Sequence, residues 1–381
     1  MLRNQRTKFS LPAKGTYLNC AYMSPLLKSV EKAGIMGIQR KRNPLNTRPE
    51  DFFTETDSLR ALFAGLINCP EKNRVVAIPS VSYGMANVVA NVPMKKGDEV
   101  VVATAQFPSN VYPWQRLCQD RGGKIIAVAP PEALQRRGQQ WNQRILEAIG
   151  LRTKVVALGH VHWADGTRFD LKAIRQRTRE VGALLVIDGT QSVGALPFSW
   201  QEIQPDALVC AGYKWLMGPY SFGLACYGPY FDQGKPIEEN WINRKFSEDF
   251  AGLVNYQTDY QPGALRYEVG EHSNFVLLPM MIAALNQVQA WQPDRIQTFC
   301  EAISKKAIAH LREHDFWVEE EHRGHHLFGV RLPAHKDISV VKQKLQQAGM
   351  NVSFRGDSIR VAPHLYNTAE ELNRFAKLLV A

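Results

Sequence analysis

Lys214 is the residue in this chain whose neighbours point most clearly to chemistry. It stands between Tyr213 and Trp215 in the segment AGYKWLMGPYSFG, directly after a run of small apolar residues. A lysine in a partly dry site loses its proton readily and can form an imine with an aldehyde. On this segment alone, an ordinary surface lysine whose stem lies on two aromatic rings explains the pattern equally well.

A carboxylate, Asp188, ends another apolar run in the segment VIDGTQSVGALP. Taken alone, an acidic residue at this position is compatible with a helix N-cap. A second interpretation is that the carboxylate binds a protonated ring nitrogen and so turns a pyridine into an electron sink. One predicted strand, residues 206–212, separates Asp188 from Lys214, which places both residues at the carboxyl edge of one sheet.

The elements that must position these residues alternate between strand and helix. Short runs rich in Val, Ile, Leu and Ala predict strands that are covered on both faces. Amphipathic stretches lie between most of them, and one of these ends at Gly182 as a helix C-cap would. This alternation predicts the α/β class, a three-layer sandwich with a mostly parallel sheet. The predicted strands are residues 74–80, 98–106, 124–130, 154–162, 183–191, 206–212 and 223–228.

The pattern changes after about residue 255. Two amphipathic helices are followed by short strands at 325–332 and 358–363, with a helix near 337–348 between them. This predicts a smaller α+β C-terminal domain. We expect residues 16–254 to form the large domain, and residues 1–15 together with 255–381 to form the small domain.

The composition narrows the class of protein. The 381 residues include 46 Lys and Arg against 36 Asp and Glu, a net charge of +10, but the positive charges are dispersed. An anionic cofactor and substrate explain this balance better than nucleic acid does. No apolar run is long enough to span a membrane and no secretory h-region is present, so we expect a cytoplasmic protein. The six scattered cysteines have no zinc-ligand spacing, so they are expected to be reduced and no metal site is expected.

The motifs DGTQSVGALP and GYKWLMGPYSFG, in this order, resemble those of the class V family of pyridoxal-phosphate enzymes. The family includes cysteine desulfurases, kynureninase, isopenicillin N epimerase-like proteins and several aminotransferases. The resemblance extends from YLNCAYMSP near the start of the chain to RVAPHLYNTAEEL near its end. It implies the transferase fold type I, pyridoxal 5'-phosphate (PLP) as the cofactor, an amino acid as the substrate, and a homodimer.

Carried over to this sequence, the family pattern makes Lys214 the lysine that forms the imine with PLP. The same lysine later carries the proton at the substrate α-carbon. Asp188 would pair with the pyridine nitrogen, and Gln191 would face the phenolic oxygen of the ring. Ser82 and Tyr83 match the phosphate-binding turn at the start of a helix, where backbone N–H groups attract a phosphate.

Further positions follow from the same resemblance. Tyr213 is expected to donate its hydroxyl to the phosphate, and Phe107 is expected to stack on the cofactor ring. His160 and His162 follow a strand, where residues two apart share a face. Of these two we expect His162 to approach the cofactor, whereas a structural role fits His160 at least as well. Arg360 matches the arginine that receives the substrate α-carboxylate, a role that suits a guanidinium fork.

The sequence also departs from the family pattern. Phe107 stands where many desulfurases have a histidine, and the loop before Arg360 lacks their cysteine, since the nearest one is Cys300 on a predicted helix. These departures predict that the chain is not a persulfide-forming cysteine desulfurase. Glu271 stands where family members have a threonine that reaches the phosphate of the neighbouring subunit. A carboxylate beside a phosphate is unfavourable, so the sequence does not decide whether the subunits share this contact. Arg355 is a second candidate for the carboxylate, although we expect it to be exposed to solvent.

The predicted function is that of an aminotransferase-type PLP enzyme that acts on an amino acid whose amino group has replaced the lysine on the cofactor. One alternative is a β-lyase, either a C–S lyase or a kynureninase-like enzyme, which Phe107 suggests. Another is an epimerase similar to isopenicillin N epimerase. A non-catalytic relative is less consistent with the joint presence of Lys214, Asp188 and Arg360.

Overall fold

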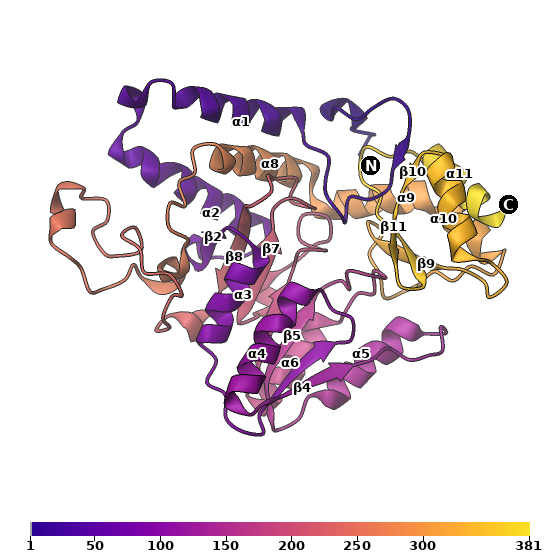
Figure 1. Ribbon diagram of the computed structural model, residues 1–381, viewed down its shortest axis with the longest axis horizontal. Coiled ribbons are helices and arrows are strands. Elements are labelled where there is room, and N and C mark those ends of the chain that lie inside the picture. The colour runs from indigo at the N-terminus through magenta and orange to yellow at the C-terminus, as the bar shows by residue number, and fades with distance from the viewer. Residues whose placement is uncertain (1) are drawn as a thin grey trace.

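A seven-stranded sheet forms the centre of the chain in a computed structural model that describes residues 2–381 (Figure 1). The strands lie in the order β2-β8-β7-β6-β5-β3-β4. Neighbouring strands are parallel, except that β8 runs antiparallel to both β2 and β7. The strands are β2 (Val75–Ile78), β3 (Glu99–Ala103), β4 (Lys124–Val128), β5 (Thr153–Gly159), β6 (Leu184–Asp188), β7 (Ala207–Ala211) and β8 (Gly223–Tyr227).

The predicted α/β fold with a mostly parallel sheet is confirmed. Each of the predicted apolar runs contains one strand, and every residue of β2, β3, β7 and β8 is buried. Burial is continuous because helices cover both faces of the sheet. Since β8 runs in the opposite direction, its first residue, rather than its last, lies at the edge where the other strands end.

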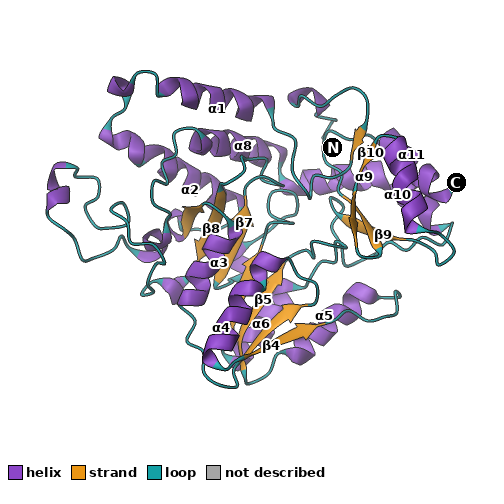
Figure 2. Cartoon of the chain, viewed as in Figure 1, coloured by secondary structure: helices purple, strands orange, loops and turns teal. Residues whose placement is uncertain are grey.

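Helices on both faces of the sheet produce the three layers (Figure 2). On one face, Met85 of α3 (Val81–Ala90) and Trp114 of α4 (Tyr112–Arg121) join an apolar cluster with the sheet. A second cluster on the other face includes Phe63, Trp141, Ile174 and Met281. These come from α2 (Thr54–Leu66), α5 (Arg137–Ala148), α6 (Leu171–Val181) and α8 (Leu277–Trp291). The remaining helices of this part are α1 (Lys28–Arg40), which contacts α8, and the short α7 (Trp200–Ile203).

The C-terminal part of the chain combines a small antiparallel sheet with helices. Its strands lie in the order β11-β12-β9, and the first strand of the chain, β1, pairs with β10. The predicted division at residues 15/16 and 254/255 stays a proposal. The elements are β1 (Thr16–Tyr17), α9 (Pro293–Arg312), β9 (Phe328–Arg331), α10 (Ile338–Gln347), β10 (Met350–Asn351), β11 (Ser353–Arg355), β12 (Ser358–Val361) and α11 (Ala369–Val380).

The connections that leave β3 and β5 diverge at one edge of the central sheet. The chain passes from β3 through α4 to β4 on one side, and from β5 through α6 to β6 on the other side. Where neighbouring parallel strands send their connections in opposite directions, a crevice opens beyond the strand ends. The sheet order therefore places a site between the loops after β3 and β5.

Other expectations from the sequence concern residues away from this edge. All six cysteines are free and buried. Within residues 2–381, no helix has the length and apolar composition needed to cross a bilayer. His310, Glu313 and His314 bring possible metal-ligand atoms together at the C-terminal end of α9, a grouping that the cysteine and histidine spacing did not indicate.

We predict that Asp165→Ala destabilises the fold by about 3–5 kcal/mol, because it leaves a buried cation without its partner. The carboxylate is 5% exposed, and it accepts hydrogen bonds from Nη2 of Arg137 at 3.3 Å and from the amide of Thr167 at 3.1 Å. The backbone carbonyl oxygen of Asp165 also accepts a hydrogen bond from the amide of Gly329. This bond ties the loop after β5 to β9.

The measurement is the urea midpoint and slope at neutral pH. Asp120→Ala is the matched control, because its ion pair with Arg116 is exposed and is expected to contribute less than about 1 kcal/mol. A loss at Asp165 no larger than that of the control would contradict the prediction.

Candidate active site

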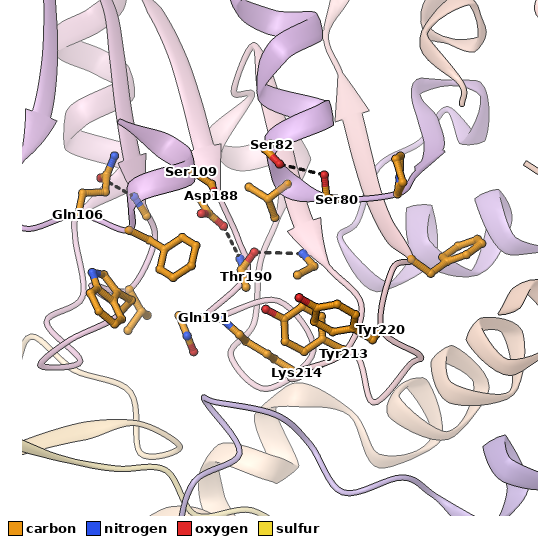
Figure 3. A pocket seen from close by; sticks show the side chains of 18 of the residues that line it. Ser80, Ser82, Gln106, Ser109, Asp188, Thr190, Gln191, Tyr213, Lys214 and Tyr220 are labelled. Carbon is orange, nitrogen blue, oxygen red and sulfur yellow. Dashed lines mark hydrogen bonds between the residues drawn. The ribbon is translucent and has the colours of Figure 1, made fainter. Parts of the chain in front are cut away.

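A cavity of about 270 Å³ opens at the carboxyl edge of the central sheet, at the switch between β3 and β5 (Figure 3). Its walls come from the loops after β2, β3, β5, β6 and β7 and from the turn that precedes β8. Strand ends that are far apart in sequence therefore converge on one space. The polar side chains among its lining residues are Ser80, Ser82, Gln106, Ser109, His162, Asp188, Thr190, Gln191, Tyr213, Lys214, Tyr220 and Ser221.

Lys214 lies on a tight turn that follows β7. The amide of Gly218 donates to the carbonyl of Gly212 at 2.9 Å, and a Cβ at Gly212 would lie 2.4 Å from the carbonyl oxygen of Phe222, so only glycine fits there. The neighbouring Trp215 is fully buried, and its Nε1 donates at 2.9 Å to Oε1 of Gln191, in the loop after β6. The lysine is thus held between the start of β8 and the end of β6.

Lys214 is buried beside two aromatic rings. Its Nζ lies 5.4 Å from the ring centroids of both Phe107 and Tyr213, and the residue is 6% exposed. Burial lowers the pKa of Lys214 to about 8, although the carboxylate of Asp188 opposes the shift. A substantial fraction of the amine is therefore neutral near pH 7–8, as attack on an aldehyde requires. Lys214 is not an ordinary surface lysine.

Asp188 is the last residue of β6 and lines the same cavity. Its Oδ1 accepts from the amide of Thr190 at 2.9 Å, and Oγ1 of Thr190 accepts from the amide of Ala211 at 3.0 Å. Burial raises the pKa of the Asp188 carboxyl, while the hydrogen bonds from Thr190 and the charge of Lys214 act in the opposite direction. A buried carboxylate of this kind favours a cationic partner such as a protonated ring nitrogen.

The N-terminus of α3 supplies a position for an anion. Oγ of the N-cap Ser80 accepts from the amide of Tyr83 at 3.2 Å and lies 3.0 Å from Oγ of Ser82. The amides of Val81 and Ser82 belong to the first turn, where no intrahelical acceptor exists, and both residues line the cavity. Tyr83 does not line the cavity, because its amide donates to Ser80 and its hydroxyl donates to Glu238 at 2.6 Å.

Gln191 and Tyr213 both line the cavity, but their polar groups differ in availability. The amide of Gln191 is largely engaged, since Nε2 donates to the carbonyl of Ala21 at 3.0 Å and Oε1 accepts from Trp215. A second N–H on Nε2 stays free for a ring oxygen. The ring of Tyr213 lies 4.6 Å from that of Tyr220, and burial raises the pKa of the Tyr213 hydroxyl, which therefore remains a donor.

Aromatic rings from the loops after β3 and β5 cover one side of the cavity. Phe107 and Trp163 meet edge to face, with their ring centroids 5.5 Å apart. Nε1 of Trp163 donates to the carbonyl of Ala105 at 2.7 Å, which fixes the indole against the β3 loop. The two rings form a wall on which a flat ligand can stack.

His160 and His162 do not share a face, contrary to the expectation from strand alternation. Strand β5 ends at Gly159, so the two-residue period of a strand does not reach them. His162 lines the cavity, with Nδ1 3.2 Å from Oδ1 of Asp165. His160 packs against Phe198 outside the cavity, with ring centroids 5.9 Å apart.

Arg360 lies behind the aromatic wall rather than in the lining itself. Its Nη1 donates to the carbonyl of Trp163 at 2.8 Å, its guanidinium carbon lies 6.0 Å from the Trp163 ring centroid, and its buried Nε has no hydrogen-bond partner. Burial lowers the pKa of Arg360 to about 9, and Arg355 adds to the shift. A buried cation without a counter-charge is suited to bind an anion.

The structure therefore brings most of the residues that the sequence indicated around one cavity. Ser82, Phe107, His162, Asp188, Gln191, Tyr213 and Lys214 line it, whereas Tyr83 and Arg360 do not. The sequence analysis missed Ser80, Ser109, Trp163, Thr190 and Tyr220, which also line it. A cap position before α3 and the place next to Asp188 could have indicated Ser80 and Thr190, but no local pattern marks the others. Within residues 2–381, no cysteine lines the cavity.

This arrangement suits a flat, anionic aldehyde. The start of α3 can hold the anion, Phe107 can cover an aromatic ring, Asp188 can hold a protonated ring nitrogen, and Lys214 can attack the aldehyde carbon. Each group comes from a different strand end, so the chemistry depends on the sheet order.

The comparisons with known proteins agree with this geometry. The family described as aminotransferase class-V matches residues 39–375. The chain is 32% identical to a probable cysteine desulfurase of Methanothermobacter thermautotrophicus, over 84% of this chain and 82% of that protein.

Two solved proteins share the fold. One is a cysteine desulfurase of Thermococcus onnurineus, with a TM-score of 0.82 and 18% identity over 100% of this chain and 98% of that chain. The other is the cystine C–S lyase C-DES, with a TM-score of 0.84 and 18% identity over 96% of this chain and 98% of that chain. A variant of C-DES carries glycine covalently linked to its PLP cofactor.

One prediction from the sequence is wrong. The sequence predicts that the chain is not a persulfide-forming cysteine desulfurase. Its relatives and structural neighbours, however, include many cysteine desulfurases. The exclusion depended on Phe107 in place of a histidine and on a missing loop cysteine. Neither of these two positions affects the placement of Lys214 and Asp188, which line the same cavity.

Proposed function

The chain belongs to the aminotransferase class-V family and is a PLP-dependent enzyme, and from this premise we propose that it cleaves the carbon–sulfur bond of a sulfur-containing amino acid. The observation that carries the proposal is the buried amine of Lys214, which lies between Phe107 and Tyr213 at the same sheet edge as Asp188. The identity with a probable cysteine desulfurase and the fold shared with a cystine C–S lyase support a sulfur-containing substrate.

The residues of the cavity fit PLP. The first amides of α3, with Ser80 and Ser82, would hold its phosphate, because they are unpaired donors at a helix N-terminus. Asp188 would hold the proton of the pyridine nitrogen, and Gln191 would donate its free N–H to the ring oxygen. Phe107 would cover one face of the ring.

When bound, PLP supplies an electron sink for the bonds at the substrate α-carbon. In our proposal the chain's own residues then have separate tasks. The neutral amine of Lys214 accepts the proton from the α-carbon, and the buried carboxylate of Asp188 keeps the ring nitrogen protonated. Arg360 binds the α-carboxylate, since it is a buried guanidinium that no carboxylate neutralises. Phe107 and Trp163 exclude water from one side.

The proposed reaction can be tested with L-cysteine as the probe, holoenzyme and dithiothreitol. For a thioether or thiol R–S–CH₂–CH(NH₃⁺)–COO⁻, elimination with one water yields R–SH, pyruvate and ammonium. Sulfide with pyruvate and ammonium, or sulfide with alanine, would support C–S cleavage. Formation of a keto acid that retains its sulfur and requires an amino acceptor would show transamination instead, and would contradict the proposal.

A pH dependence follows from the lowered pKa of Lys214. Only the neutral amine can attach to the PLP aldehyde, so the rate of attachment to apoenzyme should rise with pH and level off above about 8, where the amine is mostly neutral. The measurement is the growth of the imine absorbance between pH 6 and 10, with Lys214→Ala as the background for other lysines. A rate that continues to rise up to the ordinary lysine pKa of 10.5 would contradict the prediction.

We also propose that the protein is a homodimer in the cytoplasm. The free, buried cysteines suit a reducing compartment. Ile35, Met36 and Ile38 of α1 are 49%, 57% and 61% exposed, which is an apolar surface that a second copy could cover. Light scattering of the purified protein tests the dimer, and a monomer at micromolar concentration would contradict it.

A further inference from the structure

A tight hairpin places two arginines side by side near the cavity. In the antiparallel pair β11–β12, Ser353 lies opposite Arg360 and Arg355 lies opposite Ser358. Because side chains alternate along a strand, Ser353, Arg355, Ser358 and Arg360 share one face of the hairpin. Arg355 and Arg360 are therefore diagonal neighbours, at a backbone separation of about 7–8 Å that long side chains can bridge.

Both guanidinium groups lie against Trp163, a residue of the cavity wall. Their central carbons are 5.2 Å (Arg355) and 6.0 Å (Arg360) from the indole centroid. The same indole meets Phe107 at 5.5 Å, and Nζ of Lys214 lies 5.4 Å from the Phe107 ring. The charges of both arginines also contribute to the lowered pKa of Lys214, after burial.

Within residues 2–381, no carboxylate forms an ion pair with either arginine. The charged groups that shift the pKa of Arg360 are Arg355 and Tyr17, without any Asp or Glu. Nη1 of Arg355 donates to the backbone carbonyl of Phe354 at 2.8 Å, and its buried Nε has no partner. The one carboxylate of the hairpin turn, Asp357, pairs with Arg331 instead. Two close, partly desolvated cations are unfavourable unless anions accompany them.

A single amino acid α-carboxylate accounts for only one of these charges. We propose that Arg355 binds a second negative group, at the end of the substrate side chain, and that the preferred substrates are S-substituted cysteines with an anionic group beyond the sulfur. This inference rests on the proposed function for the identity of the scissile bond. Arg360 then binds the α-carboxylate, and Arg355 distinguishes acidic from neutral side chains.

The alternative role for Arg355 is a second contact to the same α-carboxylate. In that case its removal would weaken every amino acid ligand to the same extent. If it binds the distal group, its removal weakens only ligands that carry one. A pair of ligands that differ in a single charge therefore separates the two roles.

The test uses the holoenzyme with S-carboxymethyl-L-cysteine and S-carbamoylmethyl-L-cysteine, which have the same shape but end in a carboxylate and an amide. The change in cofactor absorbance on titration yields Kd without any turnover. We expect the wild type to bind the acid about 10- to 100-fold more tightly, the range for one charge-assisted hydrogen bond. Arg355→Gln should bring the Kd of the acid close to that of the amide and leave the amide within about twofold. Lys342→Gln, which removes an exposed charge 5.9 Å from the Phe354 ring, is the control and should preserve the preference.

Equal losses for both ligands in Arg355→Gln, a wild type without preference for the acid, or the absence of any spectral change with either ligand would each overturn the assignment. The products of the same incubations test the reaction separately, since C–S cleavage of the acid releases thioglycolate with pyruvate and ammonium. Selective binding of the acid without thioglycolate would contradict the proposed function, while the role of Arg355 would stand.

Discussion

Purified Lys214→Ala protein is expected to be colourless at the imine wavelength and to lose at least about 10³-fold in the rate of substrate breakdown. In the proposed function the lysine has two tasks, attachment of the cofactor aldehyde and transfer of the α-proton, and no other amine lines the cavity within residues 2–381. The alanine side chain can perform neither. The loss should therefore appear in the spectrum and in turnover together.

The measurement is the absorbance spectrum of wild type and variant, before and after borohydride. Wild type should show a yellow band that disappears on reduction and leaves a phosphopyridoxyl group on the peptide that contains Lys214. Lys305→Ala, an exposed lysine on α9, is the matched control and should keep both colour and activity. A yellow, reducible band in Lys214→Ala, or wild type that stays colourless with added PLP, would contradict the assignment.

Asp188→Asn is expected to retain PLP but to lose about 10²- to 10³-fold in turnover. Replacing one partner of a buried charge pair costs about 2–5 kcal/mol, and in the proposed function the second partner is the protonated ring nitrogen of PLP. The amide keeps the size of the carboxylate and can still accept from the amide of Thr190, so the end of β6 should retain its shape. The effect is therefore electrostatic rather than structural.

Two readouts separate these causes. The imine band of Asp188→Asn should titrate differently from that of wild type, because the ring nitrogen has lost its anionic partner, while the thermal midpoint should change little. Asp120→Asn, an exposed carboxylate on α4, is the control. Turnover of Asp188→Asn within threefold of wild type would contradict the proposed role of Asp188. A large fall in its thermal midpoint would show that the loss of turnover comes from misfolding.

The strands were predictable because their chemistry is local. β7 and β8 are continuous apolar runs, and such runs indicate strands covered on both sides wherever they stand in the chain. The reversed direction of β8 was not predictable, because direction depends on which neighbour a strand pairs with. β11 was missed for a similar reason, since a three-residue strand with a serine and an arginine has no apolar pattern.

The residues of the candidate site also differ in whether local sequence could predict their positions. Asp188 ends β6 and Lys214 lies in the turn after β7, each in a recognisable motif, so the sequence alone indicated that both lie at one sheet edge. The side chain of Tyr83 was misplaced, because its position on the helix turns the ring toward Glu238. His160 faces away from the cavity because β5 ends before it. The end of β5 is set by its hydrogen bonds to β6. The exclusion of desulfurase chemistry failed because it relied on single positions.

The sequence by itself determined the α/β class, the family and the cofactor, and it indicated the lysine that we propose to hold it, because each depends on short-range patterns of residue type. Only the tertiary structure decided which side chains meet. The pairing of two arginines with Trp163, the T-shaped contact of Phe107 with Trp163, and the burial that lowers the pKa of Lys214 all join residues from distant segments. Their physical origin is desolvation and contact across the sheet edge, which no local spacing encodes.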